Sequence, residues 1–220
     1  MDGDGISEYV IESLTGVYCA AEDGELLWTK KSDRDTTAYA AVYREPGGDR
    51  DQALILAGVN MRNRQELRAF FYDHGGRLVR QVELPYRYRV NTVMEWRGRM
   101  AYFGDGMARD RKFGLAGFDG EILFEYEETH DVRPVHIVEA RGVPVRLAKG
   151  SPPYLAVVSR FHRNASRSIF YIFSPEGRLL HKEVTMATIG LAVAQNADGA
   201  TQAILASDGA GTLWSYKLAP

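Results

Sequence analysis

One phrase recurs along this 220-residue chain: an apolar or aromatic segment, a short turn that contains glycine, and a second apolar segment. An Asp-Gly pair, or a close relative of it, between β-rich flanks supplies the positive φ that a tight antiparallel connection requires. The chain is therefore expected to be built from β-hairpins. The four copies of the phrase span residues 17–28, 67–84, 113–127 and 169–184, and their turn glycines are Gly24, Gly76, Gly120 and Gly177.

Further apolar segments precede each hairpin, so that the repeating unit has four strands. The second unit shows the full set, at residues 37–44, 53–59, 66–72 and 77–84. No stretch has the i, i+3, i+4, i+7 spacing of an amphipathic helix. The sequence thus predicts an all-β fold, and a repeat spacing of roughly 50 residues is typical of the four-stranded blades of a β-propeller.

The first and last units are each one strand short. The first begins at EYVIES (8–13) with no strand before it, and the last ends after TLWSYKL (212–218). Propellers usually close by pairing a strand from one terminus with the blade at the other, because an open sheet leaves an unpaired edge. This pattern favours the C-terminal part of a larger propeller, completed by a missing N-terminal part; the alternative is five imperfect blades that close on themselves. Within a single domain over 1–220, the predicted blades are 1–31, 36–84, 90–128, 134–185 and 188–220.

Composition excludes several classes of protein. The net charge of −2 and the pI near 6.2 argue against a dedicated nucleic-acid binder, which needs a basic excess. The apolar runs are strand-length, so no membrane span is predicted, and the N-terminus does not resemble a secretion signal. The single cysteine, Cys19, excludes an intramolecular disulfide. No Gly-x-Ser-x-Gly, His-Glu-x-x-His or phosphate-binding motif is present.

The N-terminal segment DGDGISEYVIES (2–13), followed by VYCAAEDGELLW (17–28), resembles the FG-GAP or VCBS type of β-propeller repeat. The DGELLW phrase is also similar to quinoprotein-like propeller blades. The FG-GAP resemblance implies adhesion or ligand binding, an exported or cell-surface bacterial protein, and calcium at an acidic loop. Asp2, Asp4 and Glu8 match acidic positions of that loop, where alternate carboxylates converge on a hard cation. The first Asp of the pattern is missing, and the alternative is a polar turn whose Asp side chains accept bonds from local backbone amides.

Charge differs between the two sets of predicted loops. In each blade, the connection from the second to the third strand and the connection to the next blade should leave at one end, and these connections are rich in arginine. Guanidinium groups hold carboxylates or phosphates through paired hydrogen bonds. The opposite connections contain mainly Asp and Glu, and the simpler alternative is that both sets are ordinary solvated loops. The predicted ligand-binding residues are Arg62, Arg64, Arg87, Tyr88, Arg160, Arg163 and Arg167.

Two functions from different classes follow from these patterns. The first is a non-catalytic propeller module that presents its arginine-rich face to a protein or an acidic carbohydrate. The alternative is the propeller portion of a carbohydrate-active enzyme such as a polysaccharide lyase, with Arg87, Tyr88 and Arg163 as candidate catalytic residues. The alternative requires those three side chains to converge in one pocket.

Overall fold

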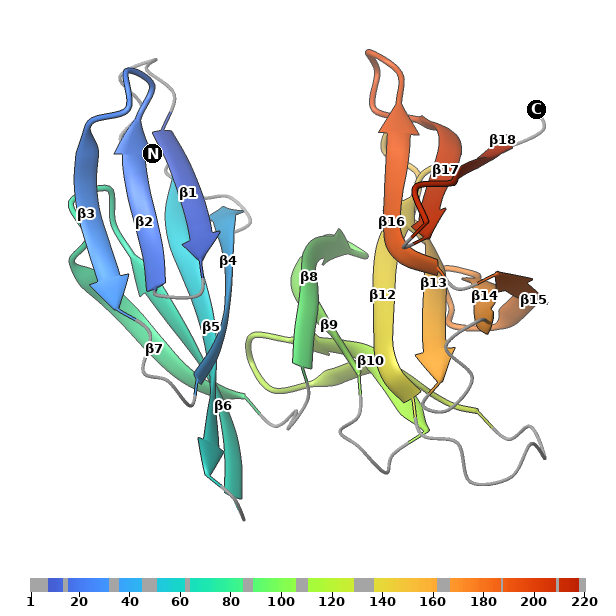
Figure 1. Ribbon diagram of the computed structural model, residues 1–220, viewed down its shortest axis with the longest axis horizontal. Coiled ribbons are helices and arrows are strands. Elements are labelled where there is room, and N and C mark those ends of the chain that lie inside the picture. The colour runs from blue at the N-terminus through green and yellow to red at the C-terminus, as the bar shows by residue number, and fades with distance from the viewer. Residues whose placement is uncertain are drawn as a thin grey trace. The chain divides into compact units, whose positions relative to one another are not determined.

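The computed structural model describes residues 8–13, 16–31, 36–44, 51–61, 64–84, 89–105, 111–128, 137–161, 167–186, 188–208 and 210–217. These residues form 18 β-strands and no helix (Figure 1). The strands pair into five antiparallel sheets of three or four strands, each a simple meander along the chain. The predicted all-β fold is therefore confirmed for the described residues.

The sheets follow one another in sequence. Sheet 1 contains β1 (Glu8–Ser13), β2 (Gly16–Ala21) and β3 (Leu26–Lys31), and sheet 2 contains β4 (Thr36–Arg44), β5 (Asp51–Met61), β6 (Arg64–Tyr72) and β7 (Leu78–Leu84). Sheet 3 contains β8 (Arg89–Trp96), β9 (Arg99–Asp105), β10 (Lys112–Gly117) and β11 (Ile122–Glu127). Sheet 4 contains β12 (Ile137–Val145), β13 (Tyr154–Phe161), β14 (Arg167–Phe173) and β15 (Leu179–Met186). Sheet 5 contains β16 (Thr188–Gln195), β17 (Thr201–Asp208) and β18 (Leu213–Lys217).

Sheets 1 and 5 each have three strands in the described part of the chain, as the sequence predicts for the first and last units. The strands that they hold differ. In sheets 2 to 4 we label the strands a to d in chain order. Strand β4, position a of sheet 2, lies against β1, and β12, position a of sheet 4, lies against β9, position b of sheet 3. Strand β16 likewise lies against β13, which is position b of sheet 4, so β16 is position a and sheet 5 holds positions a to c. Strand β1 contacts position a of sheet 2, as a position-b strand does, so sheet 1 holds positions b to d.

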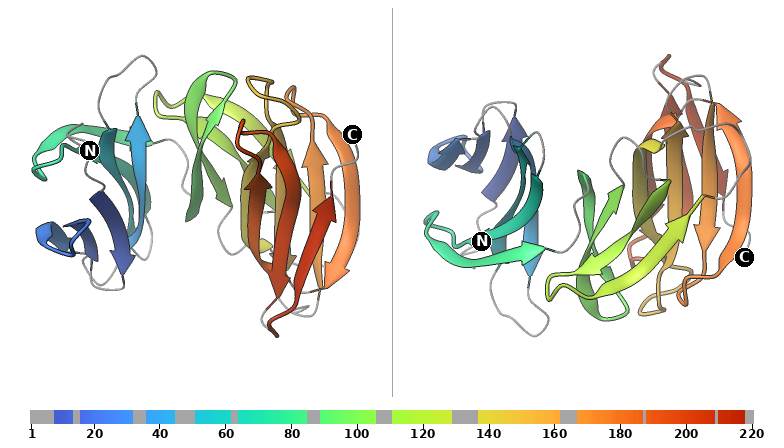
Figure 2. Two further views of the ribbon diagram at one scale, coloured as in Figure 1. Left: turned by 90° about the horizontal axis from the view of Figure 1, so that it is seen from above. Right: turned by 90° about the horizontal axis from the view of Figure 1, so that it is seen from below.

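The chain divides into two compact units. Unit 1 comprises Met1–Val90 together with Gly117–Glu121, and unit 2 comprises Asn91–Ala116 and Ile122–Pro220. Sheets 1 and 2 belong to unit 1, whereas sheets 4 and 5 and most of sheet 3 belong to unit 2. Figure 2 shows the strands of each sheet from two further sides.

Within unit 2, sheet 4 is covered on both faces. Alternate residues of a strand point to opposite faces, and both sets are apolar in β13 and β14. Leu155 and Val157 pack into a core with sheet 3, whereas Ala156 and Val158 pack into a core with sheet 5. A sheet with two buried faces needs nearly continuous apolar strands. This explains the runs YLAVV and SIFYIF, which carry no simple polar alternation.

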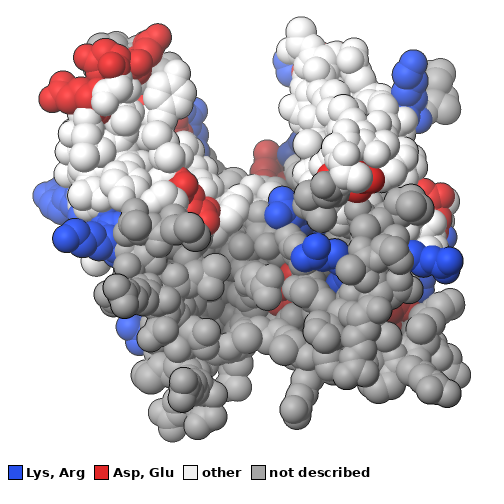
Figure 3. Space-filling model, viewed as in Figure 1, with Lys and Arg blue, Asp and Glu red and all other residues white. Residues whose placement is uncertain are grey.

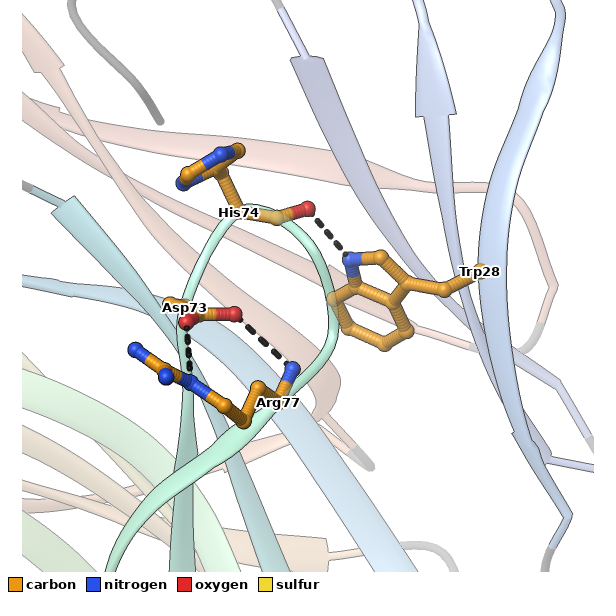
Figure 4. Close-up of polar contacts among 4 residues, drawn as sticks. All are labelled: Trp28, Asp73, His74 and Arg77. Atoms are coloured by element: carbon orange, nitrogen blue, oxygen red, sulfur yellow. Dashed lines mark hydrogen bonds and ion pairs between the residues drawn. The ribbon is translucent and has the colours of Figure 1, made fainter.

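Sheets 1 and 2 are joined in unit 1 by an aromatic residue that sits on a turn glycine. Trp28 of β3 lies beside Gly76, in the turn between β6 and β7, and its Nε1 donates to the carbonyl oxygen of His74 at 2.9 Å (Figure 4). A Cβ atom on Gly76 would lie 2.7 Å from Trp28 Cγ, so only glycine fits without displacement of the ring. The Gly76 φ of +73° is also one that glycine adopts readily.

Sheets 3 and 4 repeat this arrangement in unit 2. Phe124 of β11 covers Gly177 in the turn between β14 and β15, where an added Cβ would meet the ring at 2.9 Å. Phe124 also packs edge-on against Phe173, with ring centroids 4.8 Å apart, as Trp28 packs on Tyr72 at 6.0 Å. The aromatic residue stands four positions after its own turn glycine in both sheets. The hairpin phrase of the sequence therefore also encodes how one sheet packs on the next.

Candidate functional site

Each sheet has two ends with different connections. We call the end that carries the a-to-b and c-to-d connections the turn end, and the end that carries the b-to-c and d-to-a connections the loop end. Of the predicted ligand-binding residues, Arg160 and Arg167 are described at the loop end of sheet 4, and Arg64 opens β6. Glu8 opens β1, opposite Ala21. The remaining predicted site residues lie outside the described residues: Arg62, Arg87, Tyr88, Arg163, Asp2 and Asp4.

Two of the predicted arginines, Arg160 and Arg167, lie at the loop end of sheet 4 on adjacent strands, and Arg141 lies in the middle of the strand next to β13. Arg160, near the end of β13, pairs with Ser168 of β14, so Arg167, which opens β14 with an exposed side chain, points to the opposite face of the sheet. Arg141 of β12 pairs with Val158, two residues before Arg160, so Arg141 and Arg160 are diagonal neighbours on one face of the sheet. The sequence predicted Arg160 and Arg167 as ligand-binding residues. It did not single out Arg141, which lies within a strand and not in a loop.

A buried polar network lies at the same end of unit 2, between sheets 3 and 4. Its centre is Glu128, which follows β11 directly and is 3% exposed. Tyr171 donates from its hydroxyl group to Glu128 Oε2 at 2.7 Å, and the Lys182 ammonium group donates to Oε1 at 2.7 Å. The Ser159 hydroxyl lies 3.1 Å from that of Tyr171, and since the phenol proton goes to Glu128, Ser159 is the donor. Strands β13, β14 and β15 are thus tied to the end of β11.

The environment of Tyr171 keeps its hydroxyl group protonated. Burial raises the pKa of Tyr171 far above its ordinary value of 10.0, and the negative charge of Glu128 raises the pKa further, whereas the bond to Ser159 lowers it. Neighbouring Tyr126, whose ring centroid is 5.5 Å from that of Tyr171, has its pKa raised by burial and then by Glu128. Both phenols are therefore hydrogen-bond donors at neutral pH, and neither is suited to act as a general base.

A second buried carboxylate, Asp105, ends β9 at the loop end of sheet 3. It is 1% exposed, and its Oδ2 accepts a bond from the backbone N–H of Ala140 in β12 at 2.6 Å. This bond joins strand b of sheet 3 to strand a of sheet 4. Two buried carboxylates, Asp105 and Glu128, therefore fix the loop ends of these sheets to each other. Sequence patterns gave no sign of either role, because the partners are 35 and 43 residues away along the chain.

The turn end carries a mixture of charges. In unit 1, Glu22, Asp23 and Glu25 are exposed around the turn between β2 and β3, and acidic side chains gather at that end of the unit (Figure 3). Elsewhere the turn end also holds arginines, which the predicted acidic set did not include. These are Arg77, Arg97, Arg146 and Arg178, of which Arg77 is paired with Asp73 and Arg146 with Glu95.

Several turn carboxylates and amides serve the local backbone. Asp23 Oδ1 accepts from the N–H of Glu25 at 2.9 Å, and Asn196 Oδ1 and Asp198 Oδ1 both accept from the N–H of Ala200. This is the local bonding that Asp and Asn provide in turns. Among the residues that the structure describes, no three His, Cys, Asp or Glu side chains are grouped so as to hold a metal ion.

The buried polar network has a structural role. The hydrogen bonds of Glu128, Tyr171, Ser159 and Lys182 satisfy one another inside the protein, which is how buried polar groups are normally accommodated. They hold the loop end of unit 2. The arginines at that end carry guanidinium groups, which suit carboxylate, sulfate or phosphate.

Comparison with known proteins gives a likeness of fold only. No protein-family model matches the sequence, and no curated protein matches it. The structure is similar to the crystal structure of a protein of unknown function from Bacteroides caccae, with a TM-score of 0.61 and 12% sequence identity. The match covers 97% of this chain and 79% of that chain. At this identity the likeness supports a shared arrangement of strands and carries no function across.

The described part of the chain contains no helix that is long and apolar enough to cross a membrane.

Proposed function

We propose that this chain is a non-catalytic β-propeller module, of the FG-GAP or VCBS type, that binds an acidic ligand at the loop end of its sheets. Meandering sheets of three or four strands that repeat at a spacing of roughly 50 residues support a propeller. The recurrent packing of an aromatic residue on the turn glycine of the next sheet supports one too. The FG-GAP or VCBS assignment depends on the sequence of residues 2–28, and the calcium that it implies at Asp2, Asp4 and Glu8 belongs to the same proposal.

One observation supports the proposed ligand class: Arg160 and Arg167 lie at the loop end of sheet 4 on adjacent strands, and Arg141 is a diagonal neighbour of Arg160 on the face that Arg160 shares. Their backbones are held by strand pairing and by the polar network below, so an anion would not have to order the chain in order to bind. A preorganised site of this kind loses less entropy on binding. An acidic carbohydrate or an acidic protein segment supplies the carboxylate or sulfate groups that such a site recognises.

The experiment is binding to heparin and to polygalacturonate, measured at several salt concentrations. The double variant Arg160→Ala/Arg167→Ala should weaken binding by about tenfold or more, since a charge-assisted hydrogen bond contributes roughly 1.5–3 kcal/mol. The matched control is Arg97→Ala/Arg178→Ala, which removes the same charge from the turn end of unit 2. Equal losses in the two variants would show a non-specific charge effect and reject the site.

A further inference from the structure

Two buried serines flank Arg160 at the loop end of sheet 4. Ser159 precedes Arg160 on β13, Ser168 is the residue paired with Arg160 on β14, and both serines are 0% exposed. Alternate residues of a strand point to opposite faces, so Ser159 points toward sheet 3, whereas Arg160 and Ser168 share the face toward sheet 5. A buried hydroxyl group needs a hydrogen-bond partner, so the partners of the two serines show what holds this part of β13.

Toward sheet 3, Ser159 is the last member of the buried polar network. Its hydroxyl group lies 3.1 Å from that of Tyr171, which donates in turn to Glu128 at 2.7 Å. Glu128 directly follows β11, the last strand of sheet 3. The backbone position just before Arg160 is therefore linked to sheet 3 through two consecutive hydrogen bonds.

Toward sheet 5, Ser168 bonds to the residue that opens β16. Ser168 Oγ accepts from the backbone N–H of Thr188 at 2.9 Å and lies 3.5 Å from the Thr188 carbonyl oxygen. Thr188 is itself only 3% exposed. The Thr185 hydroxyl group of β15 also donates to the backbone carbonyl of Ser168, at 3.4 Å. The residue paired with Arg160 is therefore held by sheet 5 on one side and by β15 on the other.

A third buried serine of sheet 4 shows that this role is not common to all of them. Ser174 follows β14 at the turn end and is 6% exposed. Its Oγ accepts from the backbone N–H groups of Glu176 and Arg178, at 3.2 Å and 3.3 Å. Both partners belong to the turn of Ser174 itself. The hydroxyl groups that link sheet 4 to its neighbours are thus those of Ser159 and Ser168, on either side of Arg160.

The backbone around Arg160 is thus tied to both neighbouring sheets, and Arg141 is its diagonal neighbour on the same face. We propose that Ser159 and Ser168 are positioning residues of the anion site: their bonds fix the end of β13, so that Arg160 meets the ligand in one place. A fixed arginine loses less conformational entropy on binding than one on a mobile strand end. This inference rests on the proposed function, and it adds that affinity depends on two buried hydroxyl groups that do not touch the ligand.

The test is heparin binding by the full chain, measured at several salt concentrations and well below the melting temperature of every variant. Ser159→Ala and Ser168→Ala should each weaken binding by about two- to tenfold, the cost of ordering a long side chain that is no longer held. The slope of affinity against salt should stay unchanged, because the same charges meet the ligand. Arg160→Ala, by contrast, should lower both the affinity and the slope.

Two further variants separate positioning from a general loss of stability. Tyr171→Phe removes the partner of the Ser159 hydroxyl group, so it should weaken heparin binding as Ser159→Ala does, and the double variant should bind no worse than either. Ser168→Thr keeps a hydroxyl group and should retain the affinity that Ser168→Ala loses. The matched control is Ser174→Ala, which removes the same atom from a buried serine at the other end of sheet 4 and should bind like the unchanged protein.

The outcomes distinguish this inference from the proposed function. If the unchanged protein does not bind heparin, or if Arg160→Ala binds it equally well, the proposed function fails and the positioning role fails with it. If Arg160→Ala weakens binding but Ser159→Ala and Ser168→Ala bind like Ser174→Ala, only the positioning role is overturned. Equal losses in all three serine variants would overturn it too, because the effect would then not depend on the end of the sheet.

Discussion

Two interfaces share one packing plan but bury different residues: the interface between sheets 1 and 2, and the interface between sheets 3 and 4. Near the turn end the two agree: an aromatic residue of the first sheet covers the turn glycine of the second, at Gly76 and at Gly177. Both interfaces also place a lysine over an aromatic ring. Lys30 lies 4.8 Å from the centroid of Tyr72, and Lys182 lies 5.8 Å from that of Tyr171.

The difference between the interfaces increases toward the loop end. In unit 1, the described core between the sheets is apolar, with Cys19, Val17 and Ile55 around Trp28. In unit 2, the apolar core gives way to Glu128 and its partners, with Asp105 bonded to β12 nearby. Burial of polar groups costs free energy unless each is bonded, so such a network is tolerated where rigidity or binding at that end is required. The packing plan is thus common to both units, and the polar additions distinguish unit 2.

The largest loss of stability is expected where an aromatic ring lies closest to a turn glycine. Gly76→Ala places a Cβ 2.7 Å from Trp28 Cγ at a φ of +73°. Left-handed strain contributes roughly 1–2 kcal/mol and overpacking roughly 1–3 kcal/mol, so the free energy of unfolding should fall by about 2–5 kcal/mol. Gly24→Ala is the control, because its turn is equivalent and the added Cβ meets no atom within 4 Å. It should lose only the strain, roughly 1–2 kcal/mol, and equal losses in urea unfolding would contradict the packing plan.

Most of this plan could be read from the sequence, and the polar network could not. The turn glycines and the apolar runs determine the strands and the sheet order, because a hairpin depends on residues close together in the chain. Strand alternation explains the buried ring of Tyr171 but gives no sign of the partner of its hydroxyl group. That partner, Glu128, directly follows β11. Their contact joins residues 43 apart, and no local pattern records such a pairing.

The arginine site shows the same limit. Arg160 and Arg167 were predicted because they border a predicted loop, whereas Arg141 becomes a neighbour of Arg160 only through the pairing of β12 with β13. Register between strands depends on the hydrophobic pattern of the whole sheet and on its turns. The sequence therefore predicts which residues lie near a loop more readily than it predicts which side chains on different strands become neighbours.

An effect of intermediate size is expected from the network that distinguishes unit 2. Lys182→Met leaves a carboxylate that is 3% exposed without one of its hydrogen-bond donors, and the free energy of unfolding should fall by about 2 kcal/mol. Adding Glu128→Gln should recover part of that loss, since the buried charge is then gone; we expect a coupling energy of about 1 kcal/mol in the double-mutant cycle. The control is Lys112→Met, whose pair with Glu125 is about one-third exposed on both sides and contributes about 0–1 kcal/mol. If the free-energy changes of the two single variants simply added up in the double variant, Glu128 and Lys182 would not act together.

The smallest effect concerns the turn that supports Trp28 in unit 1. Asp73 Oδ1 accepts the N–H of Arg77 at 2.8 Å, and Oδ2 pairs with the Arg77 guanidinium at 3.1 Å (Figure 4). Partial burial raises the pKa of Asp73, but the bonds from Arg77 outweigh burial and hold the pKa below its ordinary value of 3.8. A lowered pKa in the folded state means that the contribution to stability is present above the ordinary pKa and is lost as the pH falls through the folded value.

Asp73→Asn should therefore lower stability by roughly 0.3–1 kcal/mol at pH 7, and this difference should shrink as the pH is lowered toward about pH 2, because protonation of the native carboxylate removes its contribution. Thermal melts of both proteins between these pH values would measure the difference. Arg77→Ala keeps the backbone bond and removes the guanidinium, so it should show a weaker version of the same pH dependence. If the difference between Asp73→Asn and the unchanged protein stayed constant from neutral to acid pH, the charge of Asp73 would have no part in holding the turn under Trp28. The indole bond to the His74 carbonyl would then depend on the backbone geometry of the turn alone.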